Sequence, residues 1–170
     1  NKVMISIVIP ARDDDISIFS KTLESINNQK VKPTEVILVD SSSNVRIKNA
    51  FDKFNLGKIT KIYEKIPPAF AGKSTNLGLK IASSDLIGLL DTKTLPDSDW
   101  IKDYLECLKN NDIDIIFGST RFFGNSSFQN LVKDCSYGND YHETVPGTIF
   151  KKSIIHDGNL FNENSRSGYD

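Results

Sequence analysis

Two apolar runs that each end on an aspartate constrain the fold of this chain most strongly. They occupy residues 36–40 (VILVD) and 86–91 (LIGLLD). Because an unbroken aliphatic run has no polar face, each predicts a strand buried on both sides, as in the centre of a parallel sheet. Asp40 and Asp91 then fall at the carboxyl ends of their strands, the edge at which open α/β sheets bind ligands. The two carboxylates predict a site for a polar ligand at that edge.

The pattern around these runs predicts alternating strands and helices. Strands are expected at 4–9, 35–40, 59–66, 86–91 and 114–123, with another near 147–150. Helices are expected at 16–29, 45–54, 74–83, 100–108 and 128–135. Pro10 is expected to end the first strand, because proline has no N–H to donate to a ladder. The alternation predicts an α/β fold with a doubly wound, mainly parallel sheet flanked by helices.

The composition limits the partners. Lys and Arg number 21 against 22 Asp and Glu, so no global field attracts nucleic acid or an anionic membrane. Cys107 and Cys135 lack metal-ligand spacing and are expected to be small buried residues of a protein in a reducing compartment. No apolar run reaches the length of a membrane span. We expect one soluble domain with no nucleic-acid partner. Since the sequence lacks an initiator Met and a closing element after Asp170, we also expect it to be part of a longer chain.

Three local motifs have ordinary explanations. Residues 72–74 (GKS) match the end of a phosphate-binding P-loop, but Pro67 stands where that loop needs its first glycine. A loop leading into a helix is expected there instead. The acidic residues 13–15 are expected to be solvated, and His142 is expected to lie on the surface.

Several segments, taken in order, resemble the inverting glycosyltransferases of family 2, which have the Rossmann-like GT-A fold. The segments are ISIVIPARDDD, LESINNQ, EVILVDSSS, TNLGLKIASSDLIGLLDTKTLPDSDWI and FNENSRSGYD, and they span nearly the whole chain. The resemblance implies a single GT-A-like domain over residues 1–170, truncated at its C-terminus. It implies a nucleotide-binding half over about 1–97 and an acceptor-side half over about 98–170.

The resemblance also implies residues that hold a nucleotide-diphosphate sugar. Asp40 is implied to meet the nucleobase, with Ser41 in the place of the second aspartate that the family often has. Pro10, Ala11 and Arg12 are implied to line the nucleotide pocket.

A second group of implied donor residues lies in the predicted helix at 74–83. Asn76 and Gly78 match an Arg-Asn-x-Gly pattern in which Thr75 replaces the arginine, and Lys73 supplies a nearby positive charge.

Residues 91–93 match the family's D-x-D motif, whose carboxylates meet the ribose and a divalent metal bridging the diphosphate. Lys93 replaces the second acid, and an ammonium group cannot ligate a hard cation. Three alternatives stay open. Lys93 neutralises the diphosphate itself; Asp91 alone holds Mg²⁺ or Mn²⁺; or the site has lost its reaction.

Asp170 matches the family's general base, with Tyr169 in place of the usual glutamate before it. The implied activity is inverting transfer of a sugar to a carbohydrate or lipid-linked acceptor, in the cytoplasm or at the cytoplasmic face of a membrane, for a cell-envelope polysaccharide. One alternative is a degenerate GT-A domain that binds a nucleotide, sugar or protein partner without catalysis. A more distant one is a nucleotidyltransferase, which would need a glycine in the loop after the first strand.

Overall fold

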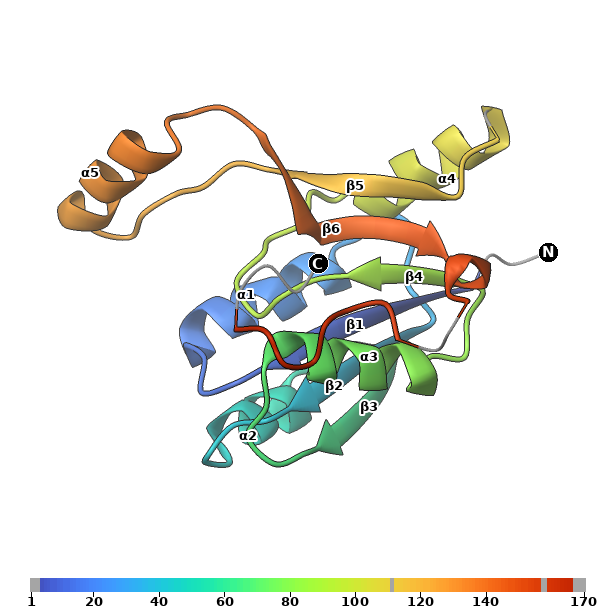
Figure 1. Cartoon of the computed structure of the whole chain (residues 1–170), viewed down its shortest axis with the longest axis horizontal. Coiled ribbons are helices and arrows are strands. Elements are labelled where there is room, and N and C mark those ends of the chain that lie inside the picture. Colours follow the sequence, from blue (N-terminus) through green and yellow to red (C-terminus); the bar gives the residue numbers. More distant parts are fainter. Residues whose placement is uncertain (1–3, 111, 157–158, 167–170) are drawn as a thin grey trace.

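The computed structural model describes residues 4–110, 112–156 and 159–166. These form a six-stranded sheet in the order β3-β2-β1-β4-β6-β5, with helices on both faces (Figure 1). The strands are β1 (Ile5–Ala11), β2 (Glu35–Asp40), β3 (Thr60–Lys65), β4 (Leu86–Leu89), β5 (Ile115–Thr120) and β6 (His142–Lys151). The helices are α1 (Ile16–Asn27), α2 (Arg46–Lys53), α3 (Ala71–Ile81), α4 (Trp100–Asn110) and α5 (Ser127–Ser136), with a 3-10 turn, η1 (Lys152–Ile154).

The sheet is mainly parallel, as predicted. The pairs β1–β2, β1–β4 and β2–β3 are parallel, whereas β6 runs antiparallel to both β4 and β5. The carboxyl ends of the first four strands therefore share one edge of the sheet, which we call the carboxyl edge.

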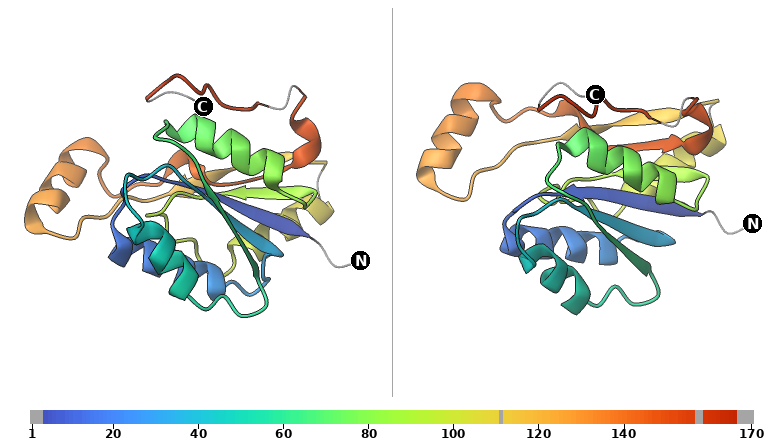
Figure 2. Two further views of the ribbon diagram at one scale, coloured as in Figure 1. Left: turned by 90° about the horizontal axis from the view of Figure 1, so that it is seen from below. Right: turned by 60° about the horizontal axis from the view of Figure 1, so that its bottom comes forward.

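Each face of the sheet buries its own apolar core. Ile5, Ile7 and Ile9 of β1 point to the face that packs against α1, α2 and α4. Val8 points to the opposite face, where it packs with Leu79 of α3. Figure 2 shows α3 on one side of the sheet and α1 and α2 on the other. The unbroken apolar runs are thus explained by helices on both faces.

The first strand runs through Pro10 to Ala11, so the predicted stop at Pro10 is wrong. The carbonyl of Val8 accepts a hydrogen bond from Leu90 on the β4 side, and alternation places Pro10 on that side too. Pairing with β4 ends at Val8 and Leu89. Pro10 lies beyond that end, where the ladder requires no donor.

A projecting arm, residues 121–141, joins β5 to β6 and carries α5 away from the sheet (Figure 1). None of the described side chains of α5 is buried, and Phe128 is 73% exposed. Strand β6 begins at His142 rather than near Gly147, because its first half pairs with β5 at the base of the arm.

Both cysteines are exposed, so the expectation that they are buried is wrong. Cys107 lies toward the end of α4, past Ile101 and Tyr104, which are the buried residues of that helix. Cys135 lies on α5, which contributes nothing to either core.

Residues 159–166, which we call the strap, cross α3 on the outside of the sheet (Figure 2). Leu160 and Phe161 meet α3 at Asn76, and Asn162 lies against Gly72 one turn earlier in the helix. The strap therefore runs antiparallel to α3, toward the carboxyl edge. None of the described helices is both long and apolar enough to cross a membrane.

Candidate active site

The two strand-end aspartates both lie at the carboxyl edge, but they differ in access. Asp40 is the last residue of β2 and is 0% exposed. Asp91 follows β4 by two residues and is half-buried. Only Asp91 presents a carboxylate to the surface.

The carboxylate of Asp40 is held inside the protein by three neighbours. Oδ1 accepts a hydrogen bond from the Ser42 amide, and Oδ2 accepts one from the Tyr63 hydroxyl, both at 2.8 Å. The Lys65 ammonium lies 3.6 Å from Oδ2. Burial and the hydrogen bond to Asp40 raise the pKa of Tyr63 well above its usual value. Asp40 therefore anchors the loop after β2, and its carboxylate is covered by these neighbours.

Ser41 ties together three loops at this edge. Its amide donates to the carbonyl of Ala11 at 2.9 Å. Its hydroxyl lies 3.2 Å from the same oxygen and 3.3 Å from the carbonyl of Ala69. An ionised aspartate at this position would have no proton to donate to either carbonyl. Serine in place of the family's second acid therefore has a local structural reason.

Asp13 connects the loop after β1 to the loop after β2 by hydrogen bonds. Its Oδ1 accepts from the Ser43 amide and hydroxyl at 2.9 Å each, and from the Asn44 side chain at 3.0 Å. Asp13 therefore holds two loops together, and the expectation that it is merely solvated is wrong. Asp15 caps the start of α1. Arg12 is exposed beside this junction, with Nη1 3.4 Å from the carbonyl of Ala69.

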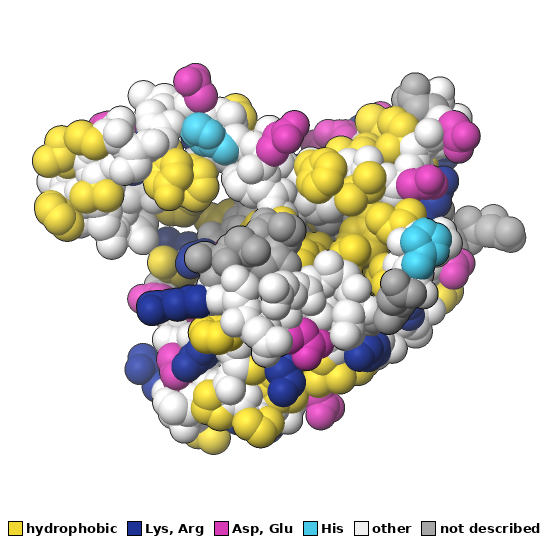
Figure 3. Space-filling view, in the orientation of Figure 1, with side chains coloured by type: hydrophobic (Ala, Val, Ile, Leu, Met, Phe, Trp, Pro, Cys, Tyr) yellow, Lys and Arg dark blue, Asp and Glu magenta, His cyan; other side chains and the backbone are white. Residues whose placement is uncertain are grey.

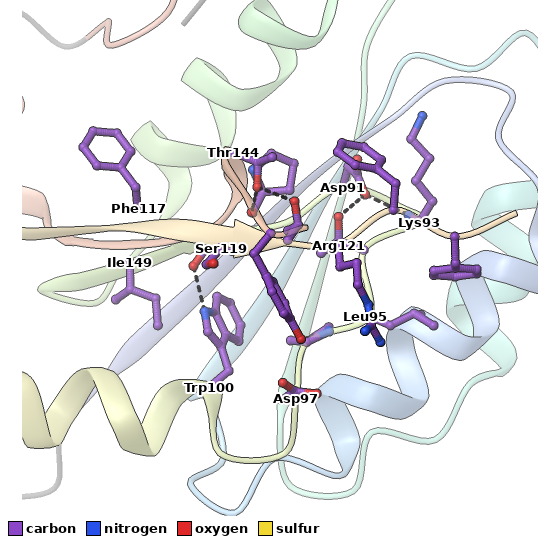
Figure 4. Close-up of a pocket in the computed structure, with 18 of the residues that line it drawn as sticks. Asp91, Lys93, Leu95, Asp97, Trp100, Phe117, Ser119, Arg121, Thr144 and Ile149 are labelled. Atoms are coloured by element: carbon purple, nitrogen blue, oxygen red, sulfur yellow. Dashed lines mark hydrogen bonds between the residues drawn. The ribbon is translucent and has the colours of Figure 1, made fainter. Parts of the chain in front are cut away.

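Asp91 has one carboxylate oxygen that is hydrogen-bonded within its own turn and one that is not. Oδ1 accepts from the Lys93 amide at 2.9 Å and from the Thr94 hydroxyl at 2.7 Å, which closes a tight turn (Figure 4). No described residue donates to Oδ2. The ammonium of Lys93 is exposed and has no ion-pair or hydrogen-bond partner among the residues described.

A cavity of about 1010 Å³ opens beside Asp91, between α4 on one side and β5, β6 and the start of the arm on the other. Trp100 forms part of its wall, held by a 2.7 Å hydrogen bond from its ring N–H to the Gly147 carbonyl (Figure 4). The cavity is lined by charged and aromatic residues, including Lys93, Asp97, Phe117, Arg121 and Tyr141.

The remaining predicted donor residues lie on α3 or at its start. Residues 72–74 form part of the first turn of α3, so the helix begins earlier than the predicted Ser74. Lys73 is exposed there, at the carboxyl edge. Asn76 is fully buried, and its amide is hydrogen-bonded to the strap. Figure 3 shows Lys and Arg side chains gathered on the left of the molecule, over the carboxyl edge and below the arm.

The predicted base, Asp170, lies outside the described residues. The strap is described as far as Arg166.

A divalent metal at Asp91 would need ligands from outside this turn. Mg²⁺ and Mn²⁺ prefer several oxygen ligands, and Asp91 is the one carboxylate in residues 91–94, with Oδ1 already hydrogen-bonded within the turn. Among the described residues, no group of three His, Cys, Asp or Glu side chains is placed to hold a metal ion.

Two residues that shape this edge were missed by sequence reasoning. Thr94 closes the turn on Asp91, and the Asp-x-x-Thr spacing is a local signal that could have revealed it. Tyr63 covers Asp40 from the next strand, 23 residues along the chain. Nothing in the local sequence indicates that contact.

Comparison with known proteins identifies the family. The model described as "Glycosyl transferase family 2" matches residues 6–163. The chain belongs to glycosyltransferase family 2. Among relatives, the hyaluronan synthase of Pasteurella multocida is 34% identical over 103 residues, which cover 59% of this chain and 11% of that protein.

Two solved structures show the same fold at low sequence identity. S. aureus TarS superimposes with a TM-score of 0.72 at 18% identity, covering 99% of this chain and 32% of TarS. The mannosyltransferase PcManGT from Pyrobaculum calidifontis, in complex with GDP-Man and Mn²⁺, gives 0.66 at 15% identity, covering 96% of this chain and 49% of that one. These matches confirm the predicted GT-A fold. The family 2 chain described here thus spans only a part of each of these relatives.

Proposed function

We propose that this family 2 domain transfers a sugar from a nucleoside diphosphate donor to an acceptor hydroxyl, with inversion at the anomeric carbon. The observation that carries the proposal is that Asp91, whose Oδ2 has no described hydrogen-bond donor, and the exposed Lys93 line the same cavity. Family membership supports it. So do the structures of TarS 1–349 with UDP-GlcNAc and of PcManGT with GDP-Man.

The exposed cations at the carboxyl edge suit a diphosphate. Lys93, Lys73 and Arg12 are all exposed there. Lys93 carries a point charge on a flexible stem, which can neutralise phosphate oxygens where the family uses a metal. In the proposed site Asp91 Oδ2 accepts a hydrogen bond from the ribose. Pro10, Ala11 and Ser41 shape the nucleoside end, and Asp40 supports that end from beneath.

The proposed reaction is a single displacement. Asp170 removes the proton of the acceptor hydroxyl while that oxygen forms its bond to the anomeric carbon. The bond from that carbon to the diphosphate oxygen breaks at the same time, and the leaving diphosphate keeps the electron pair. Lys93 stabilises the charge that develops on it. Attack from the face opposite the leaving group inverts the configuration. If Mg²⁺ or Mn²⁺ binds, Asp91 would hold it, and the ion would supply the same charge stabilisation.

The acceptor side of the proposal rests on the cavity. Phe117, Arg121 and Tyr141 belong to β5 or to the arm, and Trp100 begins α4, so this wall comes from the predicted acceptor half of the chain. Exposed aromatic rings together with polar groups suit a carbohydrate, whose faces are apolar and whose edges carry hydroxyls.

Calorimetric titration with UDP and GDP, in EDTA and then in Mn²⁺, tests the donor site. We expect binding that Asp91→Asn weakens about tenfold or more, which corresponds to at least about 1.4 kcal/mol. Asp97→Asn is the matched control, because Asp97 lines the same cavity and loses the same charge, yet its carboxylate makes no described hydrogen bond. If neither UDP nor GDP binds, the proposal is wrong.

The degenerate-domain alternative is favoured by one observation, the lysine in the D-x-D position. It predicts nucleotide binding without release of UDP from UDP-GlcNAc or of GDP from GDP-mannose. Turnover that Asp170→Asn abolishes would rule it out.

A further inference from the structure

We propose that Asn76 is a positioning residue that fastens the strap to α3 and thereby sets where the chain departs toward Asp170. The role rests on the proposed function, in which Asp170 is the base.

The side-chain amide of Asn76 is wholly committed to the strap. Oδ1 accepts hydrogen bonds from the amides of Leu160 and Phe161, both at 3.0 Å. Nδ2 donates to the Phe161 carbonyl at 2.8 Å and to Glu163 Oε1 at 3.0 Å. Two donors and two acceptor positions are all that an asparagine amide has, so its bonding capacity is filled. Asn76 is also 0% exposed, so water does not compete.

A glycine on the same face of α3 lets the strap approach closely. Gly72 lies four residues before Asn76, which places both on one side of the helix. A Cβ at Gly72 would lie 2.2 Å from the carbonyl oxygen of Asn162. Glycine and asparagine are both weaker helix formers than alanine. Gly72 and Asn76 are therefore explained by their contacts with the strap, since neither residue favours the helix itself.

The strap has an apolar anchor as well. Phe161 is only 8% exposed and belongs to the core that α3 shares with the sheet. The hydrogen bonds, the close approach at Gly72 and this buried ring act on adjacent residues. The strap is thus fixed at 160–163 by three different kinds of contact.

The direction of the strap links this fastening to the active site. It runs along α3 toward the helix end that carries Lys73, at the carboxyl edge (Figure 2). Asp170 follows Glu163, the last residue that Asn76 contacts, by seven residues. A chain advances at most about 3.5 Å per residue, so this connection spans no more than about 25 Å. Where the strap is held consequently limits where the proposed base can act.

The amide of Asn76 can be tested by changing its polarity without changing its shape. Asn76→Asp keeps the two acceptor bonds but cannot donate, and it sets two carboxylates against each other at Glu163. The double variant Asn76→Asp/Glu163→Gln restores a donor, because the glutamine amide can donate to the introduced carboxylate. Asn76→Ala removes all four bonds. Ile47→Ala is the control for lost stability, because Ile47 is buried in the other core, on α2.

Three measurements on the whole chain separate positioning from general destabilisation. They are hydrogen exchange at the Leu160 and Phe161 amides, UDP affinity by calorimetry, and kcat for nucleotide release from UDP-GlcNAc and GDP-mannose. We expect Asn76→Ala and Asn76→Asp to speed exchange at both amides and lower kcat, each about tenfold or more, with UDP affinity changed less than about twofold. The double variant should recover part of both losses. Ile47→Ala should leave kcat unchanged at a temperature where it is folded.

Each outcome has a distinct meaning. Faster exchange with undiminished kcat would overturn the positioning role and leave the proposed function intact. A kcat that falls equally in Ile47→Ala would overturn it as well, since lost stability alone would then explain the effect. Nucleotide release by none of the variants, and none by the unsubstituted chain, would overturn the proposed function and this role with it.

Discussion

The hydroxyl of Tyr63 on β3 donates a 2.8 Å hydrogen bond to the carboxylate of Asp40 at the end of β2. Asp40 is completely buried, and a buried carboxylate is stable only when its oxygens have partners. Burial and the contact with Asp40 both keep the proton on Tyr63 by raising its pKa. The pair thus closes the inner side of the proposed nucleotide site.

Tyr63→Phe should lower the free energy of unfolding by about 1–3 kcal/mol, because it leaves Asp40 Oδ2 with only the more distant Lys65. Urea denaturation measures this. Tyr141→Phe removes the same hydroxyl from a side chain that is 62% exposed and should change stability by less than about 0.5 kcal/mol. Equal stability of the two variants would contradict a structural role for the Tyr63 hydroxyl.

Glu35 should make the protein less stable in acid. Burial raises the pKa of its carboxyl, but hydrogen bonds from Ser6 and Ser83, together with the charge of Lys152, outweigh burial and hold the pKa below its usual 4.5. The ionised form is therefore favoured in the folded state. Its stabilisation is present above pH 4.5 and is lost as the pH falls through the lower folded-state pKa.

Glu35→Gln should reduce this loss of stability in acid. The free energy of unfolding, measured at intervals between about pH 6 and pH 3, should fall less steeply in the variant than in the unsubstituted protein. Parallel curves would show that Glu35 does not couple folding to protonation.

Lys93 should contribute to diphosphate binding through its charge. Lys93→Ala should weaken UDP binding in EDTA about tenfold, or about 1.4 kcal/mol, because an exposed cation facing a phosphate is lost. Lys80→Ala removes the same charge from the last turn of α3, at the helix end away from the carboxyl edge, and should not change UDP affinity. UDP affinity that is the same in both variants would remove Lys93 from the site.

Lys93→Asp should convert the site to metal-dependent binding. The substitution restores a second carboxylate two residues after Asp91, which gives Mn²⁺ a pair of oxygen ligands. Calorimetry should show weak UDP binding in EDTA and stronger binding in Mn²⁺. A variant whose affinity ignores Mn²⁺ would indicate that the turn cannot gather a metal site.

Gly78→Ala should destabilise the protein although alanine is the better helix former. A Cβ at Gly78 would lie 2.4 Å from Cγ1 of Val8, which is fully buried in β1. Overpacking of this kind costs about 1–3 kcal/mol in unfolding free energy. Urea denaturation should show the loss. Gly78→Ala should cost less stability when it is made in a Val8→Ala background than in the unsubstituted protein. A fully additive pair would mean that the two side chains do not meet.

Much of the fold could be predicted because apolar patterning is local. The run at 36–40 has no polar position, and β2 ends on Asp40 as predicted. The stop at Pro10 was wrong because the effect of a proline depends on whether a neighbouring strand still lies opposite, which β4 decides. Strand β6 was predicted too short because His142 and the polar residues after it pair with β5 at the arm.

The candidate site was less predictable, since burial of polar residues is set by distant contacts. The sequence predicts that Asp40 and Asp91 lie at one edge of the sheet. It does not predict that the Tyr63 hydroxyl bonds to Asp40, which is buried, while Asp91 stays half-buried. The partners of Asn76 lie 84 to 87 residues further along the chain. The family resemblance implied Asn76 as a donor-binding residue, and the structure shows its amide bonded to the strap.

The sheet order imposes a sequence of events on folding. Strand β6 lies between β4 and β5, so β5 is joined to the sheet only through a strand made later. During synthesis the ladder groups of β5 have no strand partner until residues 142–151 emerge. The first four strands can assemble before then, because the three pairs among them need no later strand. The parallel part of the sheet, which carries the proposed nucleotide site, can thus become ordered on the ribosome while β5 is still unpaired.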